Sequence, residues 1–148
     1  LLLYLLRAAG VSPDRLDALL NRESGLLGVS GQSADMRELL AADDPAARFA
    51  VELYAYRARK YVGAYLAVLG GADAILFGGG VGEHAPAVRA RILAGLEWAG
   101  IAVDAARNAQ ATGGEAAICP DGSRTHVWVM AADEAGELAR EALAVVGA

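Results

Sequence analysis

The chain has 148 residues, of which 55% are hydrophobic, and its mean hydropathy is +0.33. This length and composition suffice for the core of one domain and exclude a disordered tail. The formal net charge of −5 and a pI of about 5.0 do not support a nucleic-acid partner or a membrane-surface partner. The single cysteine, Cys119, cannot form an internal disulfide, and we expect a reducing, cytoplasmic location.

The first half of the chain is predicted to be helical. Ser12 is a typical N-cap residue, and Pro13 after it suits the first position of a helix. The run from Asp43 to Pro45 marks another helix start. Residues 23–33 are rich in Gly and Ser around an apolar centre, and we expect an ordered loop there. The expected helices cover residues 1–9, 13–21, 35–41 and 45–69.

The second half alternates strands and helices, which is typical of an α/β layer architecture. Asp121 and Gly122 separate two weak strands and predict a hairpin-like turn. Asp133 is expected to cap a final helix that runs to Val146. The expected strands cover residues 73–77, 101–103, 115–119 and 125–130, and a further helix is expected over 86–99.

Four glycines within five residues follow the strand over 73–77; they are Gly78, Gly79, Gly80 and Gly82. Glycine lets a backbone approach a phosphate closely, and the free N–H groups of a helix start favour negative charge. A buried strand that opens into such a turn and then a helix therefore predicts an anion site. The same spacing also fits a tight strand-to-helix turn that binds nothing, so the glycines alone do not decide.

Two further segments combine polar side chains with a helix start. Asp35 and Arg37 flank Met36, and Asp133 precedes Glu134 after a predicted strand. Each has a purely structural alternative as a helix cap or as a partner of the helix dipole. Ligands of open α/β sheets collect where strands end and helices begin. If both strands belong to one sheet, a carboxylate would lie beside a phosphate-binding backbone, an arrangement that suits Mg²⁺.

Taken together and in order, three segments resemble the acetokinase family: Ser24–Gly31, Asp35–Arg37 and Gly80–His84. That family carries a Ser-Gly-Leu-Leu-Gly loop, a Ser-Asp-hydrophobic-Arg segment and a Gly-Ile/Val-Gly-Glu-Asn turn. The resemblance covers nearly the whole chain. It implies an α/β fold of the actin-like ATPase, ribonuclease-H-like class, helix-rich with a small sheet, that corresponds to the C-terminal half of an acetokinase.

The resemblance also implies a nucleotide site for ATP or ADP. Glu134 matches the family's glutamate for Mg²⁺ binding. His84 stands where the family usually has asparagine, and Ala132 and Ala135 stand where it usually has threonine and a second glutamate. The residues implied to contact the nucleotide are Asp35, Met36, Arg37, Gly80, Val81, Gly82, Glu83 and His84.

The implied activity is reversible in-line phosphoryl transfer between ATP and acetate, giving acetyl phosphate and ADP. The family's catalytic arginines, histidine and aspartate come from segments upstream of residue 1, so no catalytic residue is assigned here. Residues 1–148 are then expected to be the nucleotide-binding C-terminal domain of a two-domain, homodimeric enzyme, without nucleic-acid or membrane partners. A propionate or butyrate kinase and a non-catalytic dimerisation or binding module remain as alternatives.

Overall fold

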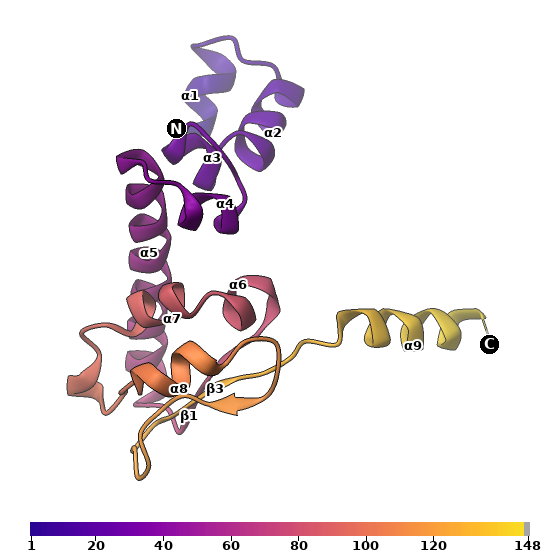
Figure 1. The fold of residues 1–148 in the computed structure, drawn as a ribbon. Coiled ribbons are helices and arrows are strands. Elements are labelled where there is room, and N and C mark those ends of the chain that lie inside the picture. Colours follow the sequence, from indigo (N-terminus) through magenta and orange to yellow (C-terminus); the bar gives the residue numbers. More distant parts are fainter. Residues whose placement is uncertain (147–148) are drawn as a thin grey trace. The chain divides into compact units, whose positions relative to one another are not determined.

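The computed structural model describes residues 1–146, without the side chain of Glu134, and the chain forms two compact units (Figure 1). The first unit covers Leu1–Lys60 and the second covers Tyr61–Ala148. The boundary lies inside the long helix α5 (Pro45–Leu69), whose backbone continues through both.

The first unit is entirely helical in the structure. As expected, the Ser12 side chain accepts a hydrogen bond from the Arg15 backbone N–H at 3.2 Å and caps the second helix. Its core comes from small and branched apolar side chains: Leu16, Met36, Leu39, Ala47, Ala50, Val51 and Ala55. Its helices are α1 (Leu2–Arg7), α2 (Pro13–Arg22), α3 (Gly25–Ser30), α4 (Met36–Ala41) and the first part of α5.

The expected loop over residues 23–33 is wrong, because α3 lies within it. Its backbone closes helical hydrogen bonds from Gly28 N–H to Ser24 O and from Gly31 N–H to Leu27 O. Gly and Ser are poor helix formers, but Leu26 and Leu27 are partly buried. Tertiary burial of an apolar face therefore outweighs the weak local propensity.

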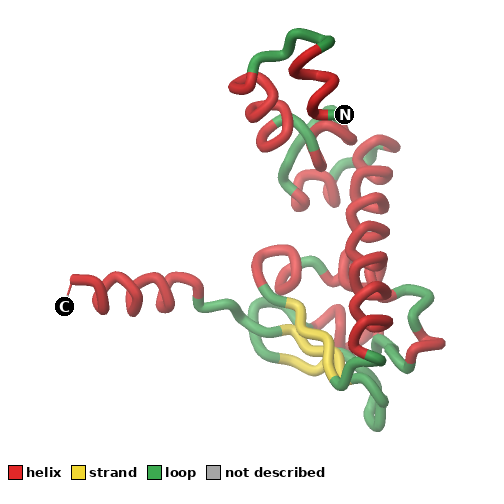
Figure 2. Tube along the Cα trace, turned by 180° about the vertical axis from the view of Figure 1, so that it is seen from behind, coloured by secondary structure: helices red, strands yellow, loops and turns green. Residues whose placement is uncertain are grey.

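The second unit contains a three-stranded mixed sheet, whose strands lie side by side in Figure 2. The strands are β1 (Ala74–Phe77), β2 (Ala116–Ala117) and β3 (His126–Val129), in the order β1-β3-β2. β1 runs parallel to β3, and β2 runs antiparallel to it. The register pairs Ala74 with His126, Phe77 with Val129 and Ala117 with Trp128. The expected hairpin between the second and third strands is confirmed.

Two elements expected in the second unit, a helix and a strand, differ in the structure. The helices of this unit are α6 (Gly79–His84), α7 (Pro86–Leu93), the 3-10 turn η1 (Glu97–Ala99), α8 (Ala105–Gln110) and α9 (Glu134–Val146). The helix expected over 86–99 ends at Leu93, because Gly95 adopts a φ of +79° and breaks it. The strand expected over 101–103 is absent from these described residues, and Asp104 instead caps α8.

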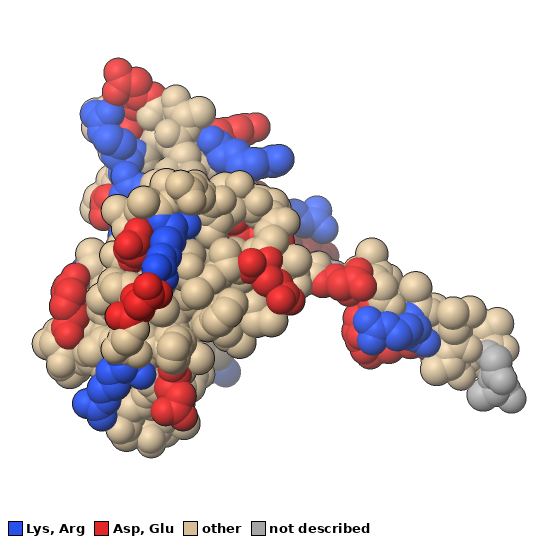
Figure 3. All heavy atoms as spheres, turned by 60° about the horizontal axis from the view of Figure 1, so that its bottom comes forward, with Lys and Arg blue, Asp and Glu red and all other residues tan. Residues whose placement is uncertain are grey.

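Buried apolar side chains of α7, β3 and the segments around them form the core of this unit: Val88, Ile92, Leu93, Leu96, Ile101, Ile118, Val127 and Val129. On the face shown in Figure 3, acidic and basic side chains lie interspersed. Within residues 1–146, no helix combines the length and the apolar character that a membrane span requires.

Candidate functional site

The carboxyl ends of β1 and β3 lie at the same edge of the sheet, because the two strands are parallel neighbours. β1 leads into the glycine segment, and β3 leads into the segment before α9. The condition left open by the sequence, that both strands belong to one sheet, is therefore met. Met130 N–H donates to Phe77 O at 2.8 Å, and Ala132 N–H donates to Glu83 Oε1 at 3.0 Å. The two junctions are thus in direct contact.

Gly78 precedes a short helix, α6, and the other three glycines lie within it rather than in an open turn (Figure 1). Gly79 has a φ of +69°, which favours glycine, and a Cβ on Gly82 would lie 3.1 Å from the backbone carbon of Phe77. Both glycines are therefore needed to pack α6 against the end of β1. A Cβ on Gly80 would meet nothing within 4 Å. The space beside the Gly80 Cα is therefore not filled by other parts of the protein.

Glu83 and His84, at the end of α6, have different environments. Glu83 is 8% exposed, and its carboxylate accepts the Ala132 N–H, as a buried carboxylate requires a donor. That side chain therefore joins α6 to the segment before α9. His84 is exposed, and its Cε1 lies 3.1 Å from the position that a Cβ on Gly113 would take. Glycine at position 113 therefore leaves room for the imidazole ring.

Arg89 of α7 is completely buried beside the glycine helix. All five of its N–H groups donate hydrogen bonds to neutral oxygens. Nε bonds Asn108 Oδ1 at 2.9 Å, one terminal nitrogen bonds the Gly82 and Glu83 carbonyls, and the other bonds the Asn108 and Ala111 carbonyls. Burial lowers the pKa of Arg89 from its ordinary value.

Sequence reasoning gave Arg89 no role. A pattern does point to it, because position 89 lies between Val88 and Ile92 on the face of α7 that is otherwise apolar. A charged residue on a buried face requires hydrogen-bond partners or a functional reason. Asn108, the side-chain partner of Arg89, carries no comparable pattern, because α8 itself was not expected.

Asp35, Met36 and Arg37 lie in the first unit, at the start of α4. Asp35 caps that helix through the Arg37 backbone N–H at 2.8 Å and forms an ion pair with the Arg37 guanidinium at 2.5 Å. These contacts lower the pKa of Asp35 to about 2. Met36 is 5% exposed and belongs to the core. Asp35 and Arg37 lie at the surface, where their side chains form an ion pair with each other.

The segment after β3 carries the residue matched to the metal role. Asp133 caps α9 as expected, since its carboxylate accepts the Gly136 N–H at 3.0 Å. Glu134 begins α9, but its side chain lies outside the described residues. Among the described residues, no cluster of three or more His, Cys, Asp or Glu side chains could hold a metal ion. Mg²⁺ commonly binds one or two carboxylates together with substrate phosphates, so Glu134 is a candidate by residue type and by its place in the sequence.

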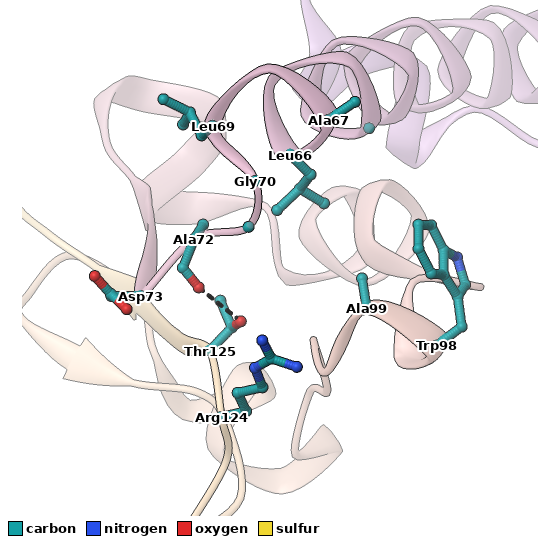
Figure 4. Close-up of a pocket in the computed structure, with 12 residues that line it drawn as sticks. Leu66, Ala67, Leu69, Gly70, Ala72, Asp73, Trp98, Ala99, Arg124 and Thr125 are labelled. Atoms are coloured by element: carbon teal, nitrogen blue, oxygen red, sulfur yellow. Dashed lines mark hydrogen bonds between the residues drawn. The ribbon is translucent and has the colours of Figure 1, made fainter.

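A pocket of about 650 Å³ lies at the other end of the strands (Figure 4). Its wall includes Asp73 and Thr125, which directly precede β1 and β3, together with the end of α5 and η1. Thr125 Oγ1 donates to Ala72 O at 2.9 Å, and the Arg124 guanidinium lies near these residues (Figure 4). The pocket is therefore separate from the edge where the glycine helix and the segment before α9 meet.

Comparisons with known proteins agree on one family. The model of the acetokinase family matches residues 1–140. An acetate kinase of Solibacter usitatus is 51% identical over 136 residues and one of Chloroherpeton thalassium is 50% identical over 146. These alignments cover 89% and 95% of this chain but 33% and 35% of the relatives, so the chain spans about a third of their length.

Solved structures give the same result. The acetate kinase of Porphyromonas gingivalis superposes with a TM-score of 0.87 at 36% identity, over 98% of this chain and 37% of that one. A propionate kinase of Francisella tularensis superposes with a TM-score of 0.77 at 32% identity, over 90% of this chain and 34% of that one. The helix-rich fold with a small mixed sheet is thus that of part of such an enzyme.

Proposed function

The chain belongs to the acetokinase family, and on that premise we propose that it supplies the nucleotide-binding part of a kinase that transfers a phosphoryl group between ATP and acetate. The proposal treats residues 1–148 as a C-terminal domain whose catalytic groups come from other segments of the protein. The observation that carries it is the contact between the two strand-to-helix junctions. The Glu83–Ala132 hydrogen bond holds the glycine helix beside the segment that leads to Glu134.

In this proposal α6 approaches the nucleotide through its backbone. The open space at Gly80 is the feature that supports it, because a phosphate or sugar oxygen approaches closely only where no Cβ intervenes. Val81, Gly82 and His84 belong to the same contact segment, and Glu83 maintains its position. In the first unit, Asp35, Met36 and Arg37 are proposed to lie beside the nucleotide, with Arg37 able to exchange its bond to Asp35 for one to the ligand.

The chemistry of phosphoryl transfer fits this division of roles. Such transfer relies on holding donor and acceptor in line and on neutralising charge on the phosphoryl oxygens. Mg²⁺, when bound, neutralises part of that charge, and Glu134 is the residue proposed to bind it. Losing a single stabilising group at such a site commonly slows the reaction about 100- to 1000-fold. The chain by itself is therefore expected to bind nucleotide without measurable turnover.

Acetate is the proposed acceptor, with propionate or butyrate as the alternative within the same class. The similarity to the structure of a propionate kinase supports this alternative. One methylene group changes specificity by only about 1–3 kcal/mol, so few residues are needed to alter the preference. We further propose a homodimer in the cytoplasm, as the resemblance implies.

Titration with Mg-ADP in a calorimeter tests the proposal against a non-catalytic module, which predicts no heat. Glu134→Ala should weaken binding in Mg²⁺ much more than binding in excess EDTA, because only the metal-dependent part is removed. Glu137→Ala is the matched control, since Glu137 lies on the same helix and pairs with Arg140. An equal loss with and without metal would contradict the metal role.

Hydroxylamine trapping of acetyl phosphate tests the assignment of catalytic groups to other segments. The purified 148-residue chain is expected to give no signal with ATP and acetate. A clear signal from that chain would show that the catalytic residues lie within it, against the proposal.

A further inference from the structure

The geometry points to Arg89 as a positioning residue that holds the nucleotide-contacting helix α6 through its last carbonyl groups; this inference rests on the proposed function. Arg89 itself has no exposed surface, so it acts only through the groups that it bonds. Its guanidinium connects the ends of two short helices, α6 and α8.

The contacts at α6 are two charge-assisted hydrogen bonds. One terminal nitrogen of Arg89 donates to Gly82 O at 2.7 Å and to Glu83 O at 2.9 Å. The last carbonyl groups of any helix lack partners within the helix. Arg89 supplies those partners, and its positive charge lies at the negative end of the α6 dipole.

Helix α6 needs such support because its sequence is unfavourable for a helix. It has six residues, three of which are glycine. A helix this short is unstable alone, and glycine loses more backbone entropy on ordering than any other residue. The same glycines leave few side chains with which α6 could pack. External donors at its carboxyl end are therefore a main restraint on its position.

The other half of the guanidinium is anchored to α8. It donates to Asn108 O and Ala111 O, both at 2.8 Å, while Nε donates to Asn108 Oδ1. Asn108 in turn donates from Nδ2 to Pro86 O at 2.9 Å. At the start of α8, Asp104 N–H donates to Ile118 O at 2.8 Å, beside β2. The restraint on α6 thus extends through Arg89 to the sheet.

Lysine cannot reproduce this arrangement, because it has three donors on one nitrogen rather than five on a planar fork. Arg89→Lys keeps the positive charge but loses at least two of the five bonds. Arg107→Lys is the matched control. Arg107 lies on α8 and donates to Cys119 O at 2.9 Å and to Asp121 at 2.8 Å, away from α6.

The experiment measures nucleotide binding and local opening in the protein that carries this chain. In Arg89→Lys, the Kd for Mg-ADP is expected to rise about 10- to 100-fold with unchanged stoichiometry. Amide hydrogen exchange, followed by mass spectrometry, should become at least about tenfold faster over residues 79–84 and stay unchanged over residues 126–129. Arg107→Lys should change neither quantity.

Two results would overturn the inference. Unchanged exchange over residues 79–84 would show that Arg89 does not restrain α6. A lower stoichiometry with unchanged Kd, and faster exchange throughout the second unit, would show a merely structural role. If Arg89→Lys does not fold, Asn108→Ala replaces it: faster exchange over 79–84 supports the inference and unchanged exchange refutes it. Absence of Mg-ADP binding to the unmodified protein refutes the proposed function instead, and the exchange measurement still decides whether Arg89 restrains α6.

Discussion

The open space at Gly80 leads to a prediction that separates ligand binding from folding. Gly80→Ala adds a methyl group that meets no atom within 4 Å beyond its chain neighbours and its own helix backbone, so the folded chain accommodates it. Alanine is also the better helix former by up to about 1 kcal/mol. The free energy of unfolding should therefore stay constant or rise by up to that amount, measured by urea denaturation followed by circular dichroism.

Binding is expected to change in the opposite direction. If a nucleotide approaches the backbone at Gly80, the added methyl group overlaps it, and such overpacking costs about 1–3 kcal/mol. That corresponds to a rise in the Kd for Mg-ADP of roughly 5- to 150-fold. Isothermal titration calorimetry of the variant and the unmodified chain in the same buffer measures this ratio directly.

Gly82→Ala is the contrasting variant. Its methyl group would lie 3.1 Å from the Phe77 backbone carbon, so the strain falls on the protein itself. It should lower the free energy of unfolding by about 1–3 kcal/mol. If Gly80→Ala leaves the Kd unchanged, or if it destabilises the chain as much as Gly82→Ala does, the reasoning about a ligand at Gly80 is refuted.

Three further predictions address other parts of the structure. Arg37 lowers the pKa of Asp35 to about 2, from its ordinary value of 3.8. The stability that the Asp35 contacts contribute should therefore be fully present above pH 3.8 and be lost as the pH falls through about 2. A carboxyl NMR titration with a midpoint near 3.8 would contradict this. Glu83→Gln keeps an acceptor for Ala132 N–H but removes its charge, and should cost about 1 kcal/mol and accelerate exchange of that amide; unchanged exchange would argue against the bond. Val127→Ala, at a fully buried position of β3, should cost about 1–3 kcal/mol in urea denaturation, and a loss below about 0.5 kcal/mol would contradict its core position.

Much of the helical framework follows from local patterns in the sequence. Ser12 with Pro13 and Asp133 before α9 have the expected capping roles, because a cap depends on a few neighbouring residues. α3 and α8 were not expected, since their short sequences have weak propensity and depend on burial against other elements. Helices of this kind are determined by tertiary contacts, which a single sequence does not reveal.

The candidate site was predicted in part. The sequence placed each junction at the end of a strand but left open whether the two strands share a sheet, and the parallel pairing of β1 with β3 shows that they do. The sequence did not indicate that Glu83 bonds Ala132 or that Arg89 spans α6 and α8. The Glu83–Ala132 bond joins residues that are distant in sequence. The Arg89 bonds to α6 end on backbone carbonyl groups, which every residue has. Residue type therefore does not identify the partner.

The parallel pairing of β1 and β3 has a consequence for the order of folding. The rung between Ala74 and His126 forms only after every residue between them has left the ribosome, whereas β2 and β3 form a local hairpin. Pairing of strands that are distant in sequence loses loop-closure entropy before any contact compensates for that loss, so such pairs form late. During synthesis β1 therefore lacks its neighbour β3 while α6, α7 and α8 are being made, and it is more open to misassociation in that interval. Misassociation through β1 should accordingly become less frequent once β3 has left the ribosome and pairs with it.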